Sequence, residues 1–247
     1  MESNAVGRPG RSHRKSGAWM SYTKEESQSQ FDYWSKSYDD SLLQRLLFVP
    51  AHDYMIGEMG GPADRGLRLL DIGCGTGNFV RRVLSEHKSA EVWGLDFSRK
   101  MIRAGAQRHA SEDSRVRFVQ ADSETLPLAD DSFDVVTCSN SFHHYPNQTA
   151  AVAEMYRVLR PGGRLLIVDG YRDRLWGRFI FDVCVVAVEG AVHHASARRF
   201  REIFYEAGFR SVRQQARLGL APFLLTVGIA AKPAKTAGLS LPPAVAA

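Results

Sequence analysis

Apolar and polar residues follow two alternating patterns along the middle of the chain. Short apolar runs with strand-like composition are separated by longer segments in which apolar residues recur at helical spacing. The pattern predicts strands at 67–71, 91–95, 115–120, 134–139 and 164–169, and helices at 78–88, 98–110 and 148–160. Strands that alternate with helices of this length form βαβ units, so we predict a mostly parallel sheet with helices on both faces.

The flanking segments follow other patterns. Residues 21–60 have a helical pattern that is interrupted at Pro50, and Gly60-Gly61-Pro62 then breaks the chain. After the fifth predicted strand, 173–190 is apolar and helix-like, and a helix at 195–207 ends at Gly208, a C-cap residue. Two further strand-like runs, 209–216 and 222–230, complete the sheet. We predict an α/β, Rossmann-like fold with a helical N-terminal cap.

Composition sets the domain plan. A chain of 247 residues with 44% hydrophobic content can bury one sizeable core. We predict a disordered basic tail at 1–20 and a helical cap at 21–62. The core domain follows at 63–231 and contains a lid insertion at 171–196, and a flexible tail rich in Pro and Ala ends the chain at 232–247.

Charge and cysteine content indicate which partners and which redox compartment suit this protein. Of the net charge of +5, the first twenty residues supply +3, through Arg8, Arg11, Arg14 and Lys15 against Glu2. The tail is a solvated segment or an anchor for anionic lipid or nucleic acid, and the near-neutral remainder argues against a nucleic-acid partner. The three cysteines, Cys74, Cys138 and Cys184, lack paired spacing and are typical of a reducing compartment.

No secretory signal is apparent, and the longest apolar stretch, 179–188, is too short to span a bilayer. We expect a cytoplasmic monomer or homodimer, with peripheral membrane contact left open.

Residues 69–77, Leu-Leu-Asp-Ile-Gly-Cys-Gly-Thr-Gly, carry the strongest chemical signal. An apolar strand ends at Asp71 and turns through glycines into a helix, a geometry that binds a nucleotide-like cofactor at the carboxyl end of a parallel sheet. The dinucleotide fingerprint G-x-G-x-x-G would place glycine at position 78, where the chain has asparagine. The observed G-x-G-x-G therefore disfavours a dinucleotide.

This motif resembles motif I of the class I S-adenosylmethionine-dependent methyltransferases. Further segments resemble the family in order, over roughly 31–231: Gly94–Ser98, Gln120–Asp122, Leu126–Leu128, Phe133–Val136 and Glu154–Gly163. The chain is most similar to the methyltransferase type 11 domain of ubiquinone- and menaquinone-biosynthesis enzymes. In that family, a seventh strand is inserted antiparallel between strands five and six, whereas the sequence by itself shows two strands joined by a short loop.

The resemblance implies S-adenosylmethionine as the cofactor and gives a set of binding residues. Asp71 would accept from the cofactor ammonium, Asp96 from the ribose diol and Asp122 from the adenine amino group; Asp96 follows Gly77 by 19 residues, close to the expected spacing. Helix capping and turn formation are the alternatives for Asp96 and Asp122. The remaining predicted cofactor contacts are Gly73, Gly75, Gly77, Phe97, Met101, Ser123 and Asn140, of which Phe97 and Met101 could equally be core residues.

Asn140 to Pro146 follow the fourth predicted strand and contain His143 and His144, the candidate catalytic bases. The alternative is that one histidine only shapes the pocket. These histidines, with His193, His194 and Cys138, lack the local spacing of a metal motif, and we predict no metal site.

The sequence thus predicts a methyltransferase that acts on a small, lipophilic or aromatic acceptor, because aromatic residues crowd 31–38 and 176–181. Ordinary core packing also explains these aromatics. The alternatives are an NAD(P)-dependent oxidoreductase, a non-catalytic cofactor-binding protein and an RNA methyltransferase.

Overall fold

A computed structural model describes residues 49–60, 66–109, 114–181, 194–218 and 222–233. Its seven strands are β1 (Arg68–Ile72), β2 (Glu91–Asp96), β3 (Val116–Gln120), β4 (Phe133–Ser139), β5 (Leu159–Gly170), β6 (Ser211–Arg217) and β7 (Phe223–Ile229). The helices are α2 (Val49–Met59), α3 (Asn78–Glu86), α4 (Arg99–His109), α5 (Gln148–Val158), α6 (Leu175–Phe179) and α8 (Ala197–Ala207), with a 3₁₀ turn, η2, at Phe142–His144.

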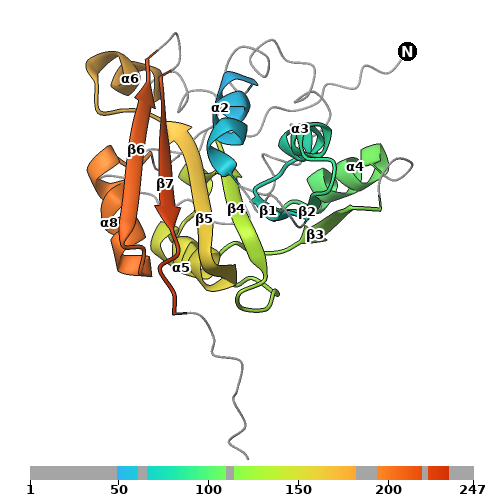
Figure 1. The fold of residues 1–247 in the computed structure, drawn as a ribbon. Helices are drawn as coiled ribbons and strands as arrows, with labels where there is room; N and C mark the ends of the chain where they lie inside the picture. The colour runs from blue at the N-terminus through green and yellow to red at the C-terminus, as the bar shows by residue number, and fades with distance from the viewer. Residues whose placement is uncertain (1–48, 61–65, 110–113, 182–193, 219–221, 234–247) are drawn as a thin grey trace, which may run out of the picture.

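The strands form one sheet in the order β3-β2-β1-β4-β5-β7-β6 (Figure 1). Strands β1 to β5 are parallel, and β7 runs antiparallel to both β5 and β6. The predicted fold class is confirmed, including the antiparallel strand between strands five and six. Strands β1 to β3 are added outward in one direction, and β4, β5 and β6 follow in the other, with β7 inserted between β5 and β6. The two halves of the sheet therefore diverge at β1 and β4, the usual place for a ligand crevice in such sheets.

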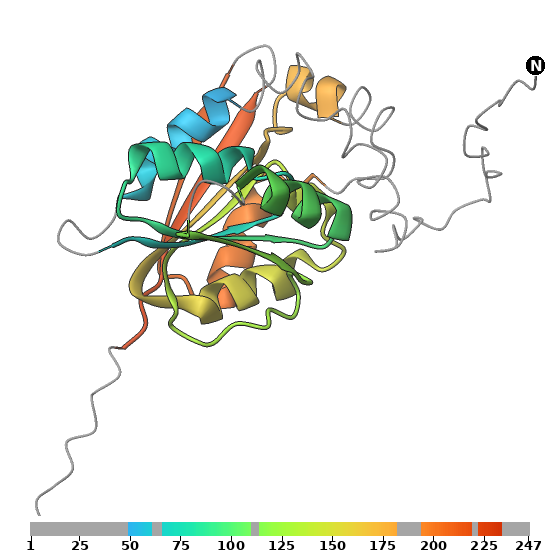
Figure 2. The same ribbon diagram turned by 90° about the vertical axis from the view of Figure 1, so that its right-hand side faces the viewer.

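Helices cover both faces of the sheet (Figure 2). Helices α2, α3 and α4 cover one face, while α5 and α8 cover the other. Strand residues alternate between two cores: Leu165 and Ile167 pack with α5 and α8, and Leu166 and Val168 pack with α2 and α3. This period of two is expected for strands with both faces buried.

Some boundaries differ from the sequence prediction. Strand β5 begins at Leu159, earlier than predicted, because Leu159 already pairs with Phe133 of β4; α5 therefore ends at Val158. Helix α2 begins at Val49, so Pro50 lies in its first turn, where the helical N–H groups need no partner within the helix; whether the helical pattern is interrupted before this point falls outside the described residues. The described part of the predicted 173–190 helix is the short α6.

Several predictions lie outside the described residues. They include the tails at 1–20 and 234–247, the cap at 21–48 with its leucine stripe and its aromatic residues, and Cys184 and His193. The part of the chain that the structure describes has no helix with the length and apolar character needed to cross a bilayer. Both described cysteines, Cys74 and Cys138, are free thiols.

Candidate cofactor and active site

A pocket that is open to solvent lies at the carboxyl ends of β1, β2 and β4. Ten of the twelve residues predicted to form the site line it: Asp71, Gly73, Gly75, Asp96, Phe97, Met101, Asp122, Ser123, Asn140 and His144. The pocket therefore brings together loops from both halves of the sheet. The other two predicted residues, Gly77 and His143, lie outside this lining.

The glycine loop shows why its residues lack side chains. Gly73, Gly75 and Gly77 all have positive φ, and Gly75 has φ +55°. A Cβ on Gly75 would meet no protein atom within 4 Å, so it would project into the open space of the pocket. The absence of a side chain here leaves bare backbone for a ligand, which supports the predicted role of Gly75.

Gly77 has a packing role in the structure. It is the N-cap of α3 with φ +83°, and a Cβ there would lie 2.8 Å from the Phe118 ring and 3.1 Å from His109 Nε2. Its predicted cofactor contact is therefore not supported by its position. The glycine lets α3 approach β3 and α4 closely.

Asp96 anchors the glycine loop. Its two carboxylate oxygens accept from Gly75 N at 2.9 Å and from Ser98 N at 2.8 Å. The capping of α4 falls to Ser98, whose Oγ accepts from Met101 N. Burial raises the pKa of Asp96 to about 6, against the opposing effect of these backbone hydrogen bonds. Each oxygen keeps a second acceptor position, so the carboxylate can also bind a diol.

Asp71 is the most buried acid of the pocket. Its Oδ1 accepts from Thr137 Oγ1 at 2.8 Å, because β1 pairs with β4 in a register that places Asp71 beside Thr137. Burial raises the pKa of Asp71 to about 7, the Thr137 hydrogen bond opposes this rise, and the charge of Asp96 adds to it. A cation in the pocket would favour the ionised form of Asp71.

The remaining predicted residues form the rim. Asp122 Oδ1 accepts from Glu124 N at 3.0 Å in a turn after β3, so the turn alternative is also realised. Asn140 has φ +51°, a conformation that Asn tolerates better than most residues. Met101 is buried, whereas Phe97 is 36% exposed and its ring borders the pocket.

Of the two adjacent histidines, only His144 lines the pocket. They lie in η2, a 3₁₀ turn, where successive side chains are about 120° apart. His144 lines the cofactor pocket, and burial lowers its pKa well below the ordinary value. His143 lies behind it, with the two ring centroids 4.2 Å apart.

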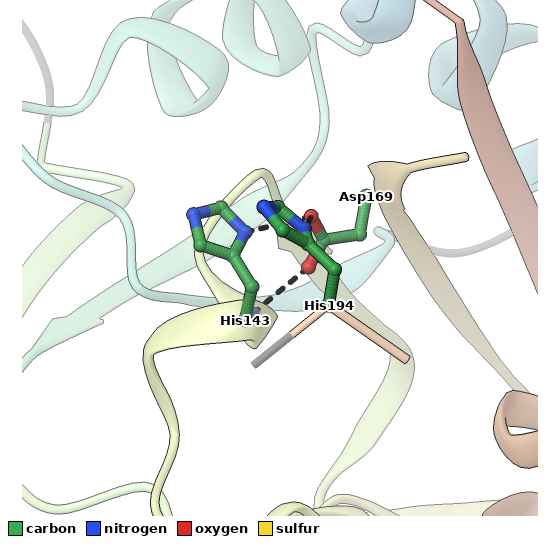
Figure 3. Close-up of side chains that lie close together, drawn as sticks. All are labelled: His143, Asp169 and His194. Carbon is green, nitrogen blue, oxygen red and sulfur yellow. Dashed lines mark hydrogen bonds and ion pairs between the residues drawn. The ribbon is translucent and has the colours of Figure 1, made fainter. Parts of the chain in front are cut away.

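His143 forms a buried pair with Asp169 at the end of β5 (Figure 3). Its Nδ1 lies 2.7 Å from Asp169 Oδ1, and its backbone N donates to Asp169 Oδ2 at 2.9 Å. Burial alone would raise the pKa of Asp169, but the charge and hydrogen bond of His143 hold it well below its usual range. With Nδ1 bonded to the carboxylate, Nε2 is the atom that can take a proton.

His194 completes the cluster from a distant part of the sequence. Its Nδ1 lies 3.6 Å from Asp169 Oδ1, and its ring centroid lies 4.5 Å from that of His143. Both ring nitrogens of this buried side chain have no hydrogen-bond partner. A buried polar group without a partner costs free energy, so a ligand atom at this place would stabilise the arrangement.

The cluster also contains a carboxylate, that of Asp169, which was not considered when the sequence was judged to lack a metal site. The ligand atoms of His143, Asp169 and His194 lie within 4.8 Å of one another. Ligand atoms around a tetrahedral divalent ion are about 3.3 Å apart, whereas the 2.7 Å separation of His143 and Asp169 is that of a hydrogen bond. The geometry favours a proton-transfer pair, and the absence of a metal site stays a prediction.

The sequence interpretation missed Thr137, Asp169 and His52, and it considered His194 without assigning it to the site. His52 of α2 borders the pocket and packs on Phe79 with ring centroids 5.0 Å apart; burial lowers its pKa to about 4. Asp169 ends a strand, as Asp71 and Asp96 do, so the rule that identified those acids would have found it. Thr137 and His52 carry no local sequence signal that would have identified them.

Comparisons with known proteins agree with this geometry. The family described as "Methyltransferase domain" matches residues 70–167. The ubiquinone/menaquinone biosynthesis C-methyltransferase of Dinoroseobacter shibae is 43% identical over 104 residues, which cover 41% of this chain and 42% of that protein. The demethylmenaquinone methyltransferase of Listeria monocytogenes is 30% identical over 225 residues, which cover 81% of this chain and 94% of that protein. The chain belongs to the class I S-adenosylmethionine-dependent methyltransferases.

The fold is shared within this methyltransferase family. A crystal structure of an S-adenosylmethionine-dependent methyltransferase from Thermotoga maritima superposes with a TM-score of 0.67 at 19% identity, covering 83% of this chain and 99% of that one. The chain spans about half the length of the first curated relatives that it matches. Membership confirms the predicted family and its cofactor, S-adenosylmethionine, and removes the NAD(P)-dependent oxidoreductase as an alternative.

Proposed function

We propose that this protein transfers the methyl group of S-adenosylmethionine to a hydroxyl-bearing, lipophilic or aromatic small molecule, with His143 as the general base. The observation that carries the proposal is the buried His143–Asp169 pair, which lies behind the pocket-lining His144. The named relatives act in quinone biosynthesis. A quinone precursor in its hydroquinone form is therefore the acceptor class that we favour.

The pocket suits the cofactor. Asp96 and Asp71 supply acceptors to hydroxyl and ammonium groups, Gly75 leaves bare backbone, and Asp122, Phe97 and Met101 border the region that a flat base would occupy. When bound, S-adenosylmethionine supplies an electrophilic methyl group on a sulfonium that is already a good leaving group. The residues that remain have to position the acceptor and remove its proton.

Proton removal falls to His143. The acceptor hydroxyl gives its proton to Nε2, and Asp169 stabilises the resulting imidazolium through Nδ1–H. The oxygen then has the electron pair for the bond to the methyl carbon. In a hydroquinone, loss of the same proton also makes the ring carbons nucleophilic, so the pair serves O- and C-methylation alike.

His144 and His194 have supporting roles in this proposal. His144 contacts the pocket and carries a strongly lowered pKa, so it is neutral and can hydrogen-bond an uncharged group. His194 presents two ring nitrogens without partners beside the pair. An acceptor oxygen that bound there would satisfy one of them, which would favour its location next to the base.

The test is a methyl-transfer assay with radiolabelled S-adenosylmethionine and a panel of hydroquinones, phenols and long-chain alcohols. We expect transfer to a hydroquinone by the wild type and a large loss of turnover in Asp169→Asn. Asp173→Asn is the matched control, because Asp173 lies nearby and accepts from the N-terminus of α8. Failure to methylate any member of the panel, or full turnover by Asp169→Asn, would contradict the proposal.

A further inference from the structure

We propose that helix α6 docks this protein onto the surface of an anionic lipid bilayer. The helix carries three exposed apolar residues: Leu175 is 87% exposed, Trp176 56% and Phe179 51%. Scattered apolar residues are normal on protein surfaces, but here they gather on a helix of five residues. The proposal concerns a surface outside the cofactor pocket and does not depend on the proposed acceptor.

The three side chains share one face of the helix. At about 100° per residue, positions 175, 176 and 179 fall within a sector of about 100°. The Trp176 and Phe179 rings stack, with centroids 5.8 Å apart and an interplanar angle of 22°. The patch is therefore continuous, and it presents two aromatic rings, which favour the boundary between lipid chains and headgroups.

Gly177 fixes this face outward. It is the buried residue of α6, and a Cβ at this position would clash with the carbonyl oxygen of Tyr171. The helix backbone consequently lies directly against the segment that leaves β5. Because the Gly177 side of the helix packs against the protein, the side that carries Leu175, Trp176 and Phe179 is exposed.

The charges around the patch are complementary to anionic headgroups. Arg174 and Arg178 are exposed on the same helix and, at about 100° per residue, both lie on the Leu175 side of the apolar face. Asp173, the neighbouring acid, accepts from Ala197 N at the start of α8, which directs its carboxylate toward that helix. Basic residues beside an apolar aromatic face are typical of helices that lie in a membrane interface.

The position of α6 would suit a lipophilic acceptor. The helix follows the carboxyl end of β5, at the edge of the sheet where the cofactor pocket also lies (Figure 1). Leu218, 62% exposed, follows β6 at the same edge, since Arg217, Phe223 and Gly170 are paired across β6, β7 and β5. Docking through α6 would turn this edge toward the bilayer.

The test measures sedimentation of the full chain with vesicles of phosphatidylcholine alone and of phosphatidylcholine mixed equally with phosphatidylglycerol. We expect binding to the mixed vesicles, and a loss of at least about tenfold in the Trp176→Ala, Phe179→Ala double variant. Replacing Arg174 and Arg178 by Gln should weaken binding about fivefold for each residue. Tyr205→Ala is the matched control: Tyr205 is 48% exposed, and α8 carries it toward the opposite edge of the sheet.

Circular dichroism and thermal unfolding establish that each variant is folded. The proposal is overturned if the wild type does not bind mixed vesicles. It is also overturned if the double variant binds as tightly as the wild type, because the basic first twenty residues would then suffice. A concentration-dependent dimer that the double variant abolishes, without vesicle binding, would assign the face to a second copy of the chain. A lowered melting temperature of the double variant, again without vesicle binding, would assign it to another segment of the same chain.

Discussion

Two groups of buried carboxylates lie at the carboxyl edge of the same sheet, and their pKa values are shifted in opposite directions. Asp71 and Asp96 border the cofactor pocket, and burial raises their pKa values to about 7 and about 6. Asp169 is just as buried, yet its pKa is held well below the usual range because His143 faces it. Burial disfavours the ionised form of all three acids, and hydrogen bonding to a histidine that can take up a positive charge offsets this cost at Asp169.

The difference indicates two kinds of task. A carboxylate whose charge is unfavourable in the empty protein is poised to bind a positively charged or hydroxyl-rich ligand. A carboxylate whose charge already has a partner is suited to orient that partner. The following predictions test this contrast in order of decreasing expected effect.

The largest effect is expected at the His143–Asp169 pair. Asp169→Asn should lower the turnover number by about 10²–10⁴, because the imidazole loses the charge that stabilises its protonated form. The dissociation constant of S-adenosylhomocysteine, measured by calorimetry, should change little. Equal losses in turnover and in affinity would show that Asp169 supports the pocket as a whole.

The next effect is expected at Asp96. Asp96→Ala should weaken S-adenosylhomocysteine binding by about a hundredfold, because two charge-assisted hydrogen bonds to the ligand and the anchor of the Gly75 loop are lost together. Asp130→Ala is the control, because Asp130 lies on an exposed loop away from the pocket and its removal should leave the dissociation constant unchanged. An unchanged dissociation constant in Asp96→Ala would remove this residue from the cofactor site.

The raised pKa values also predict opposite pH dependences for binding and for stability. Between the ordinary carboxyl pKa and a folded value of about 7, the folded chain holds a proton on Asp71 that the unfolded chain has lost. Wild-type stability therefore falls, through this group, as pH rises from about 4 to about 7. Binding of the ammonium-bearing ligand should tighten over the upper part of the same range.

The lowered pKa values of His52 and His144 contribute in the opposite direction, so the useful measurement is a difference. The melting temperature of Asp71→Asn minus that of the wild type should increase from pH 5 to pH 8. Differential scanning fluorimetry of both proteins across this range gives the result. A difference that does not change with pH would mean that Asp71 is ionised throughout.

The smallest effect is expected at His194. His194→Phe removes two buried nitrogens that have no hydrogen-bond partner, and with them the 3.6 Å contact of Nδ1 with Asp169. We expect the first effect to be the larger, so the free energy of unfolding should rise by about 1 kcal/mol and the melting temperature by a few degrees. The Michaelis constant for the acceptor should rise at the same time. A variant that is less stable than the wild type would show that His194 serves the packing of the fold.

The sequence predicted those features that depend on a strand and the turn after it. The glycine loop, the acids that end β1 and β2, and the parallel direction of the first five strands all follow from local pattern and spacing. The motif Glu154–Gly163 also has a physical basis, since Glu154 accepts from Leu126 N and Arg157 donates to Leu126 O. These bonds hold the loop between β3 and β4 against α5.

Features that depend on contacts across the fold were out of reach. Thr137 becomes a partner of Asp71 only through the register of β1 with β4. His194 reaches Asp169 only after the chain returns from α6, and His52 reaches the pocket because α2 packs beside α3. The packing role of Gly77 was out of reach for a similar reason: its neighbours, Phe118 and His109, are supplied by β3 and α4.

The divergence of the sheet between β1 and β4 has a consequence for how this molecule responds to its cofactor. Each half of the sheet contributes loops to the pocket, with Gly75 and Asp96 on one side and Asn140 and His144 on the other. A molecule bound there contacts both halves of the sheet, so β1 and β4 can separate only after it has dissociated. Amide protons on β1 and β4 should then exchange with solvent more slowly once that molecule is bound, even where they touch no ligand atom.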